Sequence, residues 1–198
     1  MANYHDIRYD MTLSSSTTGG GSMVLLETQT ASSDATISFT SNIDSTYKEY
    51  IFKLYDIHPE TDDEFLQFNL SVDSGSNYNV TKTDTVFRAY HTDDDTGTGV
   101  GYQASVDIAQ STAFANLCSG LGNGNEESLA GTLHLYNPSS TTFVKHYITH
   151  TISHHGGDLV LDEFSAGYGN TTSAVDAVQF KMSSGDIDAG VIKMYGVN

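Results

Sequence analysis

The chain repeats one local pattern: short runs in which apolar and polar residues alternate, separated by residues that form turns. In Ala35–Thr40, Ile37 and Phe39 fall on one face, because successive side chains of a β-strand point to opposite sides. Aromatic and β-branched residues are frequent in these runs, as is typical of strands. The other runs are Met23–Thr28, Tyr50–Tyr55, Phe65–Leu70, Val86–Tyr90, Leu133–Tyr136, Phe143–Ile148, Val175–Met182 and Gly190–Tyr195.

About nine or ten such runs with turns between them are typical of an all-β sandwich or barrel. We predict a jelly-roll-like β-sandwich of about ten antiparallel strands, with at most one short helix. Asn137–Thr141 is expected to be a hairpin loop, because Asn, Pro and Ser favour turns. Ser105–Cys118 has apolar residues near helical spacing but is rich in polar residues, so we expect a short helix or a packed loop.

The amino-terminal part of the chain has a different composition. Ser14–Ser22 contains only Ser, Thr and Gly, which cannot bury apolar surface. We expect residues 1–22 to be a flexible linker, or an arm that becomes ordered against a neighbour. With 12 Tyr and 9 Phe in 198 residues, the chain can build a core, and we expect residues 23–198 to form one domain.

The charge balance is strongly acidic, with 25 Asp and Glu against 8 Lys and Arg and a formal net charge of −17. This argues against binding to nucleic acids or anionic membranes, both of which select basic surfaces. No run approaches the roughly 18 apolar residues of a membrane span. One cysteine excludes an internal disulfide, and no signal peptide is recognised at the start, so we expect the protein to accumulate inside the producing cell.

Two acidic segments are candidate sites for a structural Ca²⁺ or Mg²⁺ ion, because these ions prefer oxygen ligands. The candidate ligands are Asp93, Asp94 and Asp95 in one segment and Asp62, Asp63 and Glu64 in the other. Neither segment has the complete spacing of an EF-hand loop. The alternative is that both are solvated acidic loops, and we expect no other cofactor.

The histidines give a second metal hypothesis. His146 and His150 fall on one strand face but about 13 Å apart, which is too far to share one ion. His134 would approach His146 if the hairpin register allows it. The alternative is that these histidines are polar residues of a sheet face or an interface.

Patterns typical of enzymes are incomplete. His154–Asp158 contains a His-Gly-Gly stretch, but the chain has no Gly-x-Ser-x-Gly nucleophile elbow, so we expect a glycine-rich turn. Gly97–Gly101 and Gly120–Gly124 are glycine-rich without forming a nucleotide-binding fingerprint. Cys118 has no recognisable activating partner and is expected to be a small buried or edge residue. We therefore predict that the protein is not an enzyme.

Three tyrosines lie in or near turn-rich segments and are candidate glycan contacts: Tyr78, Tyr102 and Tyr168. Exposed tyrosine rings can stack on sugars. The alternative is that these rings pack in the core or against a neighbouring subunit, where tyrosine is also favoured.

Several segments in order along residues 23–198 resemble a family of short virion structural proteins of marine tailed bacteriophages. They are Val24–Ser33, Ser45–Tyr50, Ile57–Pro59, Gly75–Asn79, Ala89–His91, Asn137–Thr142 and Phe180–Gly185. The resemblance implies a virion protein assembled in the cytoplasm of a bacterial host, and it supplies no catalytic residues. Its partners would be capsid or tail proteins of the same particle.

The resemblance leaves two positions on the particle open. One is a capsid decoration or cement protein on the head, held by the arm or by a sheet edge. The other is a tail-fibre or tail-tip domain that binds a host surface carbohydrate. Long fibres usually need coiled coils or repeats, which this chain lacks, so we expect the head position and a homo-oligomer, with a trimer as one form.

Overall fold

The computed structural model describes residues 23–198, and the predicted arm lies outside this part. The described residues form two antiparallel sheets and no helix, which confirms the all-β prediction. The strands are β1 (Met23–Asp34), β2 (Ile37–Phe39), β3 (Glu49–Pro59), β4 (Leu66–Ser71), β5 (Lys82–Thr92), β6 (Thr98–Tyr102), β7 (Ala115–Asn116), β8 (Leu129–Tyr136), β9 (Lys145–His155), β10 (Leu159–Gly169), β11 (Ala177–Met182) and β12 (Ile187–Val197).

Eight of the strands pair in a nested order that defines a jelly roll. β1 pairs with β12, β2 with β11, β3 with β8, and β4 with β7. The pairs β12–β3 and β11–β4 join these into a four-stranded unit in each layer. The predicted jelly-roll-like sandwich is therefore confirmed.

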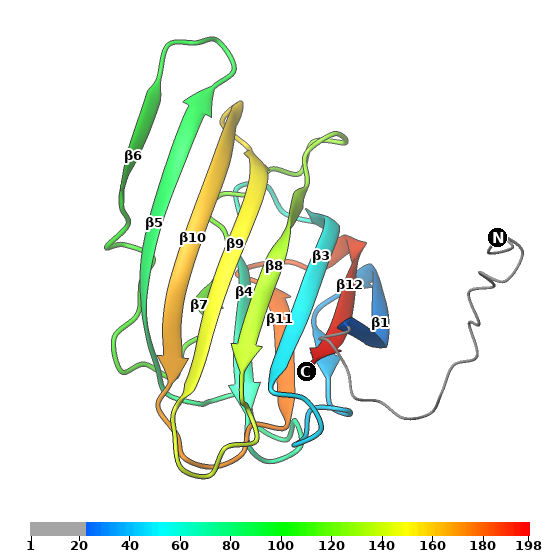
Figure 1. The fold of residues 1–198 in the computed structure, drawn as a ribbon. Helices are drawn as coiled ribbons and strands as arrows, with labels where there is room; N and C mark the ends of the chain where they lie inside the picture. Colours follow the sequence, from blue (N-terminus) through cyan, green and yellow to red (C-terminus); the bar gives the residue numbers. More distant parts are fainter. Residues whose placement is uncertain (1–22) are drawn as a thin grey trace, which may run out of the picture.

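The other four strands extend one layer. β5 and β6 lie between β4 and β7 in the chain, and β9 and β10 lie between β8 and β11. They pair in the order β8-β9-β10-β5-β6 and give an eight-stranded sheet, with β1 at one edge and β6 at the other. Figure 1 shows the smaller sheet behind this large sheet, whose outer face is turned to the viewer. We call β5, β6, β9 and β10 the extension.

Aromatic side chains fill the space between the two sheets. Phe39 of the small sheet meets Phe52 of the large sheet edge to face, with ring centroids 5.3 Å apart. Phe68 and Tyr147 make a similar contact at 5.0 Å. Ile37 and Phe39 are both buried, as their alternation predicts. These contacts hold the two layers together by burying apolar area and by favourable ring geometry.

The inner face of the extension is covered by the chain between β6 and β8. The main-chain N–H of Ile108 donates to Asp84, and the N–H and hydroxyl of Ser119 donate to Glu163, at 2.9, 2.6 and 2.8 Å. Residues 105–118 are thus a packed loop with the short strand β7, the second of the two alternatives predicted for them. This face of the sheet is closed by the protein itself.

Candidate functional site

The opposite, outer face of the extension is open. Along β9, burial alternates from Lys145 to Ser153, and His146, Ile148, His150 and Ile152 point outward. His146 and His150 therefore share one strand face, as predicted. Their neighbours on β5, β6 and β10 are set by the cross-strand register. Large apolar side chains exposed on this face are Phe87, Val100, Tyr102, Ile148, Ile152 and Val160. We call this surface the outer face.

Three rings form a ladder across the middle of the outer face. Phe87 and Phe164 stack with ring centroids 5.1 Å apart and planes 9° apart. His150 stacks on the other side of Phe164 at 4.0 Å and 12°. The His150 ring nitrogen Nε2 also lies 2.6 Å from the Asp162 carboxylate. Since the rings cover one another's faces, the ladder presents mainly ring edges to the exterior.

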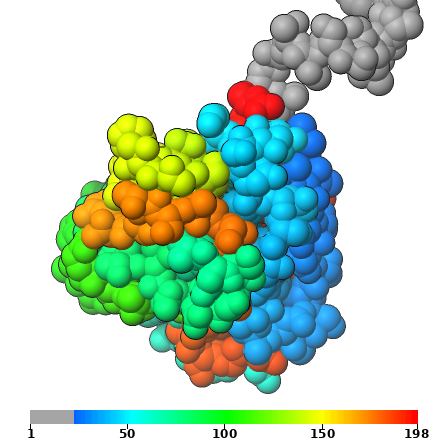
Figure 2. All heavy atoms as spheres, turned by 90° about the horizontal axis from the view of Figure 1, so that it is seen from below, coloured from blue at the N-terminus to red at the C-terminus, as the bar shows by residue number. Residues whose placement is uncertain are grey.

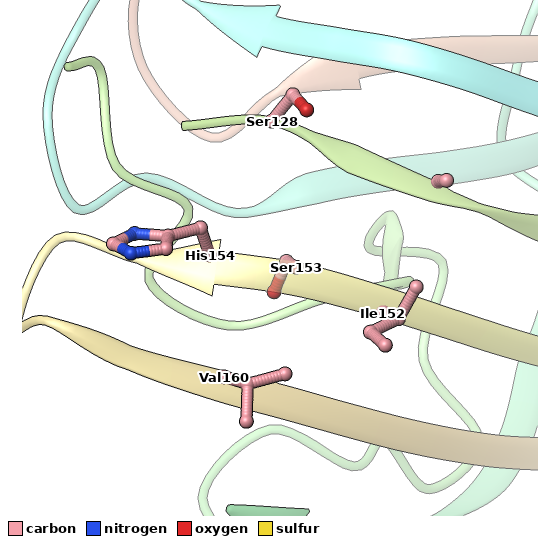
Figure 3. Close-up of a pocket in the computed structure, with 6 residues that line it drawn as sticks. Ser128, Ile152, Ser153, His154 and Val160 are labelled. Atoms are coloured by element: carbon pink, nitrogen blue, oxygen red, sulfur yellow. The ribbon is translucent and has the colours of Figure 1, made fainter. Parts of the chain in front are cut away.

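A hollow of about 230 Å³ lies beside this ladder. Its lining includes the apolar side chains of Ala130, Ile152 and Val160, and His154 closes one end. Figure 3 shows Ile152 and His154 on β9, Val160 on the neighbouring strand, and Ser128 near the start of β8. The register places Val100 of β6, which is 79% exposed, in the same cross-strand row as Ile152. The outer face therefore has both a protrusion and a recess.

The outer face carries little charge, although the whole chain has a formal net charge of −17. On the outward positions of the four extension strands, Asp162 is the one acidic residue, and it is paired with His150 at 2.6 Å. These positions hold no Lys or Arg. Low charge together with aromatic residues is typical of the core of a protein–protein interface.

The two acidic segments lie at one end of the sheet, beside the β9–β10 turn. His154 Nε2 lies 3.5 Å from Asp93, and His155 Nε2 lies 3.5 Å from Asp63. His154 Nδ1 is 3.2 Å from the Glu127 carboxylate, without the alignment of a hydrogen bond. The His-Gly-Gly stretch is a hairpin turn, as expected, in which the Gly157 N–H donates to His155 Nδ1 at 2.9 Å.

The candidate metal ligands are engaged within the protein. Asp94 accepts hydrogen bonds from the Thr96 hydroxyl and N–H, which lower its pKa, and Asp95 pairs with His91 at 2.9 Å. Asp62 accepts from the Asn123 N–H at 3.2 Å, and Glu64 accepts from the Ser183 hydroxyl. Within residues 23–198, no group of three or more His, Cys, Asp or Glu side chains is arranged to hold a metal ion. The described residues also contain no helix long and apolar enough to cross a membrane.

The histidines of the outer face are spread among different partners. His134 Nδ1 lies 2.6 Å from Glu49, while His146 lies beside the Tyr168 ring with centroids 6.4 Å apart. The register pairs His134 with Ile148 rather than His146. These histidines are polar residues of a sheet face, which is the alternative stated for them in the sequence analysis.

The glycine-rich segment before β8 is explained by packing. Gly120 has φ +61°, and a Cβ atom there would lie 2.1 Å from His155 Nε2. A Cβ on Gly122 would lie 2.1 Å from the Glu127 carboxylate. The glycines thus let the main chain approach the His155 and Glu127 side chains that stand at this end of the sheet.

The three candidate glycan tyrosines do not form one group. Tyr78 is half-buried in the β4–β5 connection, and its hydroxyl is enclosed. Tyr102 and Tyr168 belong to the extension, on β6 and β10. The Tyr102 hydroxyl donates to Asp107, which raises the pKa of this tyrosine, and its side chain is 57% exposed. Of the three, Tyr102 is the most open to a partner.

Comparison with protein-family models, curated proteins and solved structures finds no match for this chain. The outer face itself was not predicted as a unit, because Phe87, Phe164 and His150 come from three separate segments. The part of the outer face that could be recognised in the sequence is the row of alternating His and Ile residues in β9.

Proposed function

We propose that the protein is a non-enzymatic structural protein of a bacteriophage virion that decorates the head surface. The observation that carries this proposal is the edge position of β1, which among the described residues is the last strand of the large sheet. At its start, Met23, Val24 and Leu25 are 44%, 40% and 50% exposed. Figure 2 shows the blue amino-terminal residues on one side of the molecule, away from the green residues of the extension.

A long free edge strand is suited to binding another protein. Its unpaired N–H and C=O groups accept a further strand, and natural proteins usually protect such edges with charges, prolines or bulges. β1 has 12 residues, and its register shifts between Leu25 and Glu27. Its first three residues, before this irregularity, are exposed and apolar. Residues 1–22 directly precede β1 in the sequence. The edge and the arm together form the proposed contact with the capsid.

Other features fit a structural role. The Cys118 thiol is fully buried, which raises its pKa and removes it as a nucleophile. The resemblance to phage virion proteins supports the same proposal. The competing proposal, a tail-tip domain that binds host carbohydrate, is supported by the exposure of Tyr102. It is less well supported by the ladder, because stacking covers both faces of the Phe164 ring and one face each of Phe87 and His150, and so leaves fewer ring faces for a sugar.

Binding to heads that lack this protein tests the proposal. Heads would be purified from a phage in which the gene is deleted, mixed with the full chain and sedimented. We expect the chain to sediment with the heads, and Leu25→Lys to reduce binding at least tenfold, because the charge would be placed in the apolar start of the edge. Thr141→Lys, at an exposed position in the connection between β8 and β9, is the matched control.

The control should bind within a factor of about two of the original chain, since single surface charges usually change binding little away from the contact. If the original chain does not bind heads but binds isolated tails, the result would favour the tail-tip proposal. Equal binding by the Leu25 and Thr141 variants would contradict the role of the β1 edge.

A further inference from the structure

We propose that the outer face is the contact surface for a second copy of the same chain, packed face to face about a two-fold axis. The contact uses the ladder, the hollow beside it and Val100. It is separate from the β1 edge, which lies at the other side of the large sheet. The inference therefore does not depend on attachment to a capsid.

Charge identifies a second copy as the occupant. Two chains that each carry a formal net charge of −17 repel one another over most orientations. The outward positions of the extension are an exception, because their one carboxylate, Asp162, is paired with His150. A basic partner would gain little electrostatic attraction from this face and would be drawn to the acidic parts of the surface instead. An identical acidic chain, in contrast, can approach closely only through a surface of this kind.

The size of the surface is adequate for a stable dimer. β5, β9 and β10 have 11 residues each. At about 3.3 Å per residue and 4.8 Å between strands, the extension with the edge of β8 covers roughly 36 by 20 Å, or about 700 Å². Standard protein interfaces bury about 800 Å² per partner. A surface of this size that carries little charge and exposes several large apolar side chains, among them Phe87, Val100 and Ile152, would favour association.

The shape of the surface is complementary to itself. The exposed side chain of Val100 lies on β6, and the hollow is lined by residues of β8, β9 and β10. Strands β5 and β10 therefore separate Val100 from Ile152, which lines the hollow from β9. A two-fold axis parallel to the strands, between β5 and β10, exchanges β6 with β9 and β5 with β10. It places Val100 of each copy over the hollow of the other, and Phe87 opposite Phe164. Such reciprocal contacts are the rule in two-fold interfaces.

The mass of the full chain in solution gives the first test. Light scattering during size-exclusion chromatography should give about twice the chain mass of 21.4 kDa at micromolar concentration. Ile152→Asp should raise the dissociation constant at least 100-fold, because it buries an unpaired charge in the contact. Phe143→Asp is the matched control, since Phe143 is a 67% exposed apolar residue outside the extension strands.

A disulfide cross-link tests the geometry without depending on the folding of the aspartate variant. In a Val100→Cys, Ile152→Cys double variant, the two new thiols of one chain are three strands apart, about 14 Å, too far to join. We expect mild oxidation to give a covalent dimer. The single buried Cys118 does not compete. Placing one new cysteine at Phe143 instead of Val100 should abolish the cross-link.

Three results would overturn the proposal. They are a monomeric mass at micromolar concentration, an oligomer that Ile152→Asp and Phe143→Asp weaken equally, and a double-cysteine variant that stays monomeric after oxidation. A trimeric mass would contradict the two-fold axis.

Discussion

At the scale of single residues, the end of the sheet beside the β9–β10 turn depends on glycine. Gly120 combines φ +61° with a Cβ position 2.5 Å from Asp63 Oδ1 and closer still to His155. Alanine there would have to adopt a disfavoured main-chain conformation and displace both side chains. We expect Gly120→Ala to lower the free energy of unfolding by about 2–4 kcal/mol.

Thermal and urea unfolding would measure this change. Gly101→Ala is the control, because a Cβ atom there meets nothing within 4 Å. Gly101 lies in strand β6, where alanine is tolerated, and we expect a change below about 1 kcal/mol. Equal decreases in the free energy of unfolding of the two variants would contradict the packing explanation for the glycine-rich segment.

Lys82 gives a prediction about pH. Its side chain is fully buried, and desolvation lowers its pKa to about 8, although Asp84 partly opposes this. Between pH 8 and 10.5 the unfolded chain therefore binds more protons at this residue than the folded chain does, so its contribution to stability rises with pH. Relative to Lys82→Met, the original chain should gain up to about 3 kcal/mol over this interval.

Urea unfolding of both proteins at a series of pH values would measure this difference. Comparison of the two proteins removes the effect of other groups that titrate over the same range. A difference that stays constant from pH 7 to pH 10.5 would show that the Lys82 ammonium group is as well solvated in the folded protein as in the unfolded chain.

At the scale of elements, the extension is held together on its outer side by the ladder. Phe164 stacks between Phe87 and His150 and so joins three strands. Each such ring pair contributes about 0.5–1.5 kcal/mol beyond the burial of area. We expect Phe164→Ala to lower the free energy of unfolding by about 2–4 kcal/mol.

Chemical denaturation at several protein concentrations would separate this effect from that of dimer formation. Thr85→Ala is the control, because Thr85 is exposed on β5 and lies outside the ladder. Its expected cost is below about 0.5 kcal/mol. If both variants lost equally little stability at every concentration, the ladder would have no structural role in the monomer.

Local sequence patterns predicted most strands of the jelly roll but missed part of the extension. β10 escaped prediction because its inward positions include Glu163 and Ser165, so apolar and polar residues do not alternate along it. Those polar residues are buried because Ser119 and Thr149 provide hydrogen bonds. β6 contains two glycines and β7 has 2 residues, which leaves no periodic signal.

The candidate sites depend on contacts that no local pattern contains. The alternation in β9 predicted that His146 and His150 share one strand face, and that part is confirmed. The meeting of Asp63 and Asp93 beside the same turn was not predictable, because each residue reaches it from a distant segment. Pairing between strands far apart in the chain decides such contacts.

At the scale of the whole molecule, an edge and a face of one large sheet have different proposed tasks. The β1 edge and the arm are proposed to bind the capsid, and the outer face is proposed to bind a second copy. A jelly roll alone has edges and faces of this kind, but the two inserted pairs β5–β6 and β9–β10 create the broad apolar surface. The insertions thus add the surface on which the proposed contact with a second copy depends.

Immunogold electron microscopy of purified virions tests the central claim, a position on the phage head, most directly. Antibodies against the full chain should label heads at regular spacing, and the same antibodies should not label heads from a phage lacking the gene. Labelling confined to tails, or no labelling although the antibodies bind the isolated protein, would contradict the account.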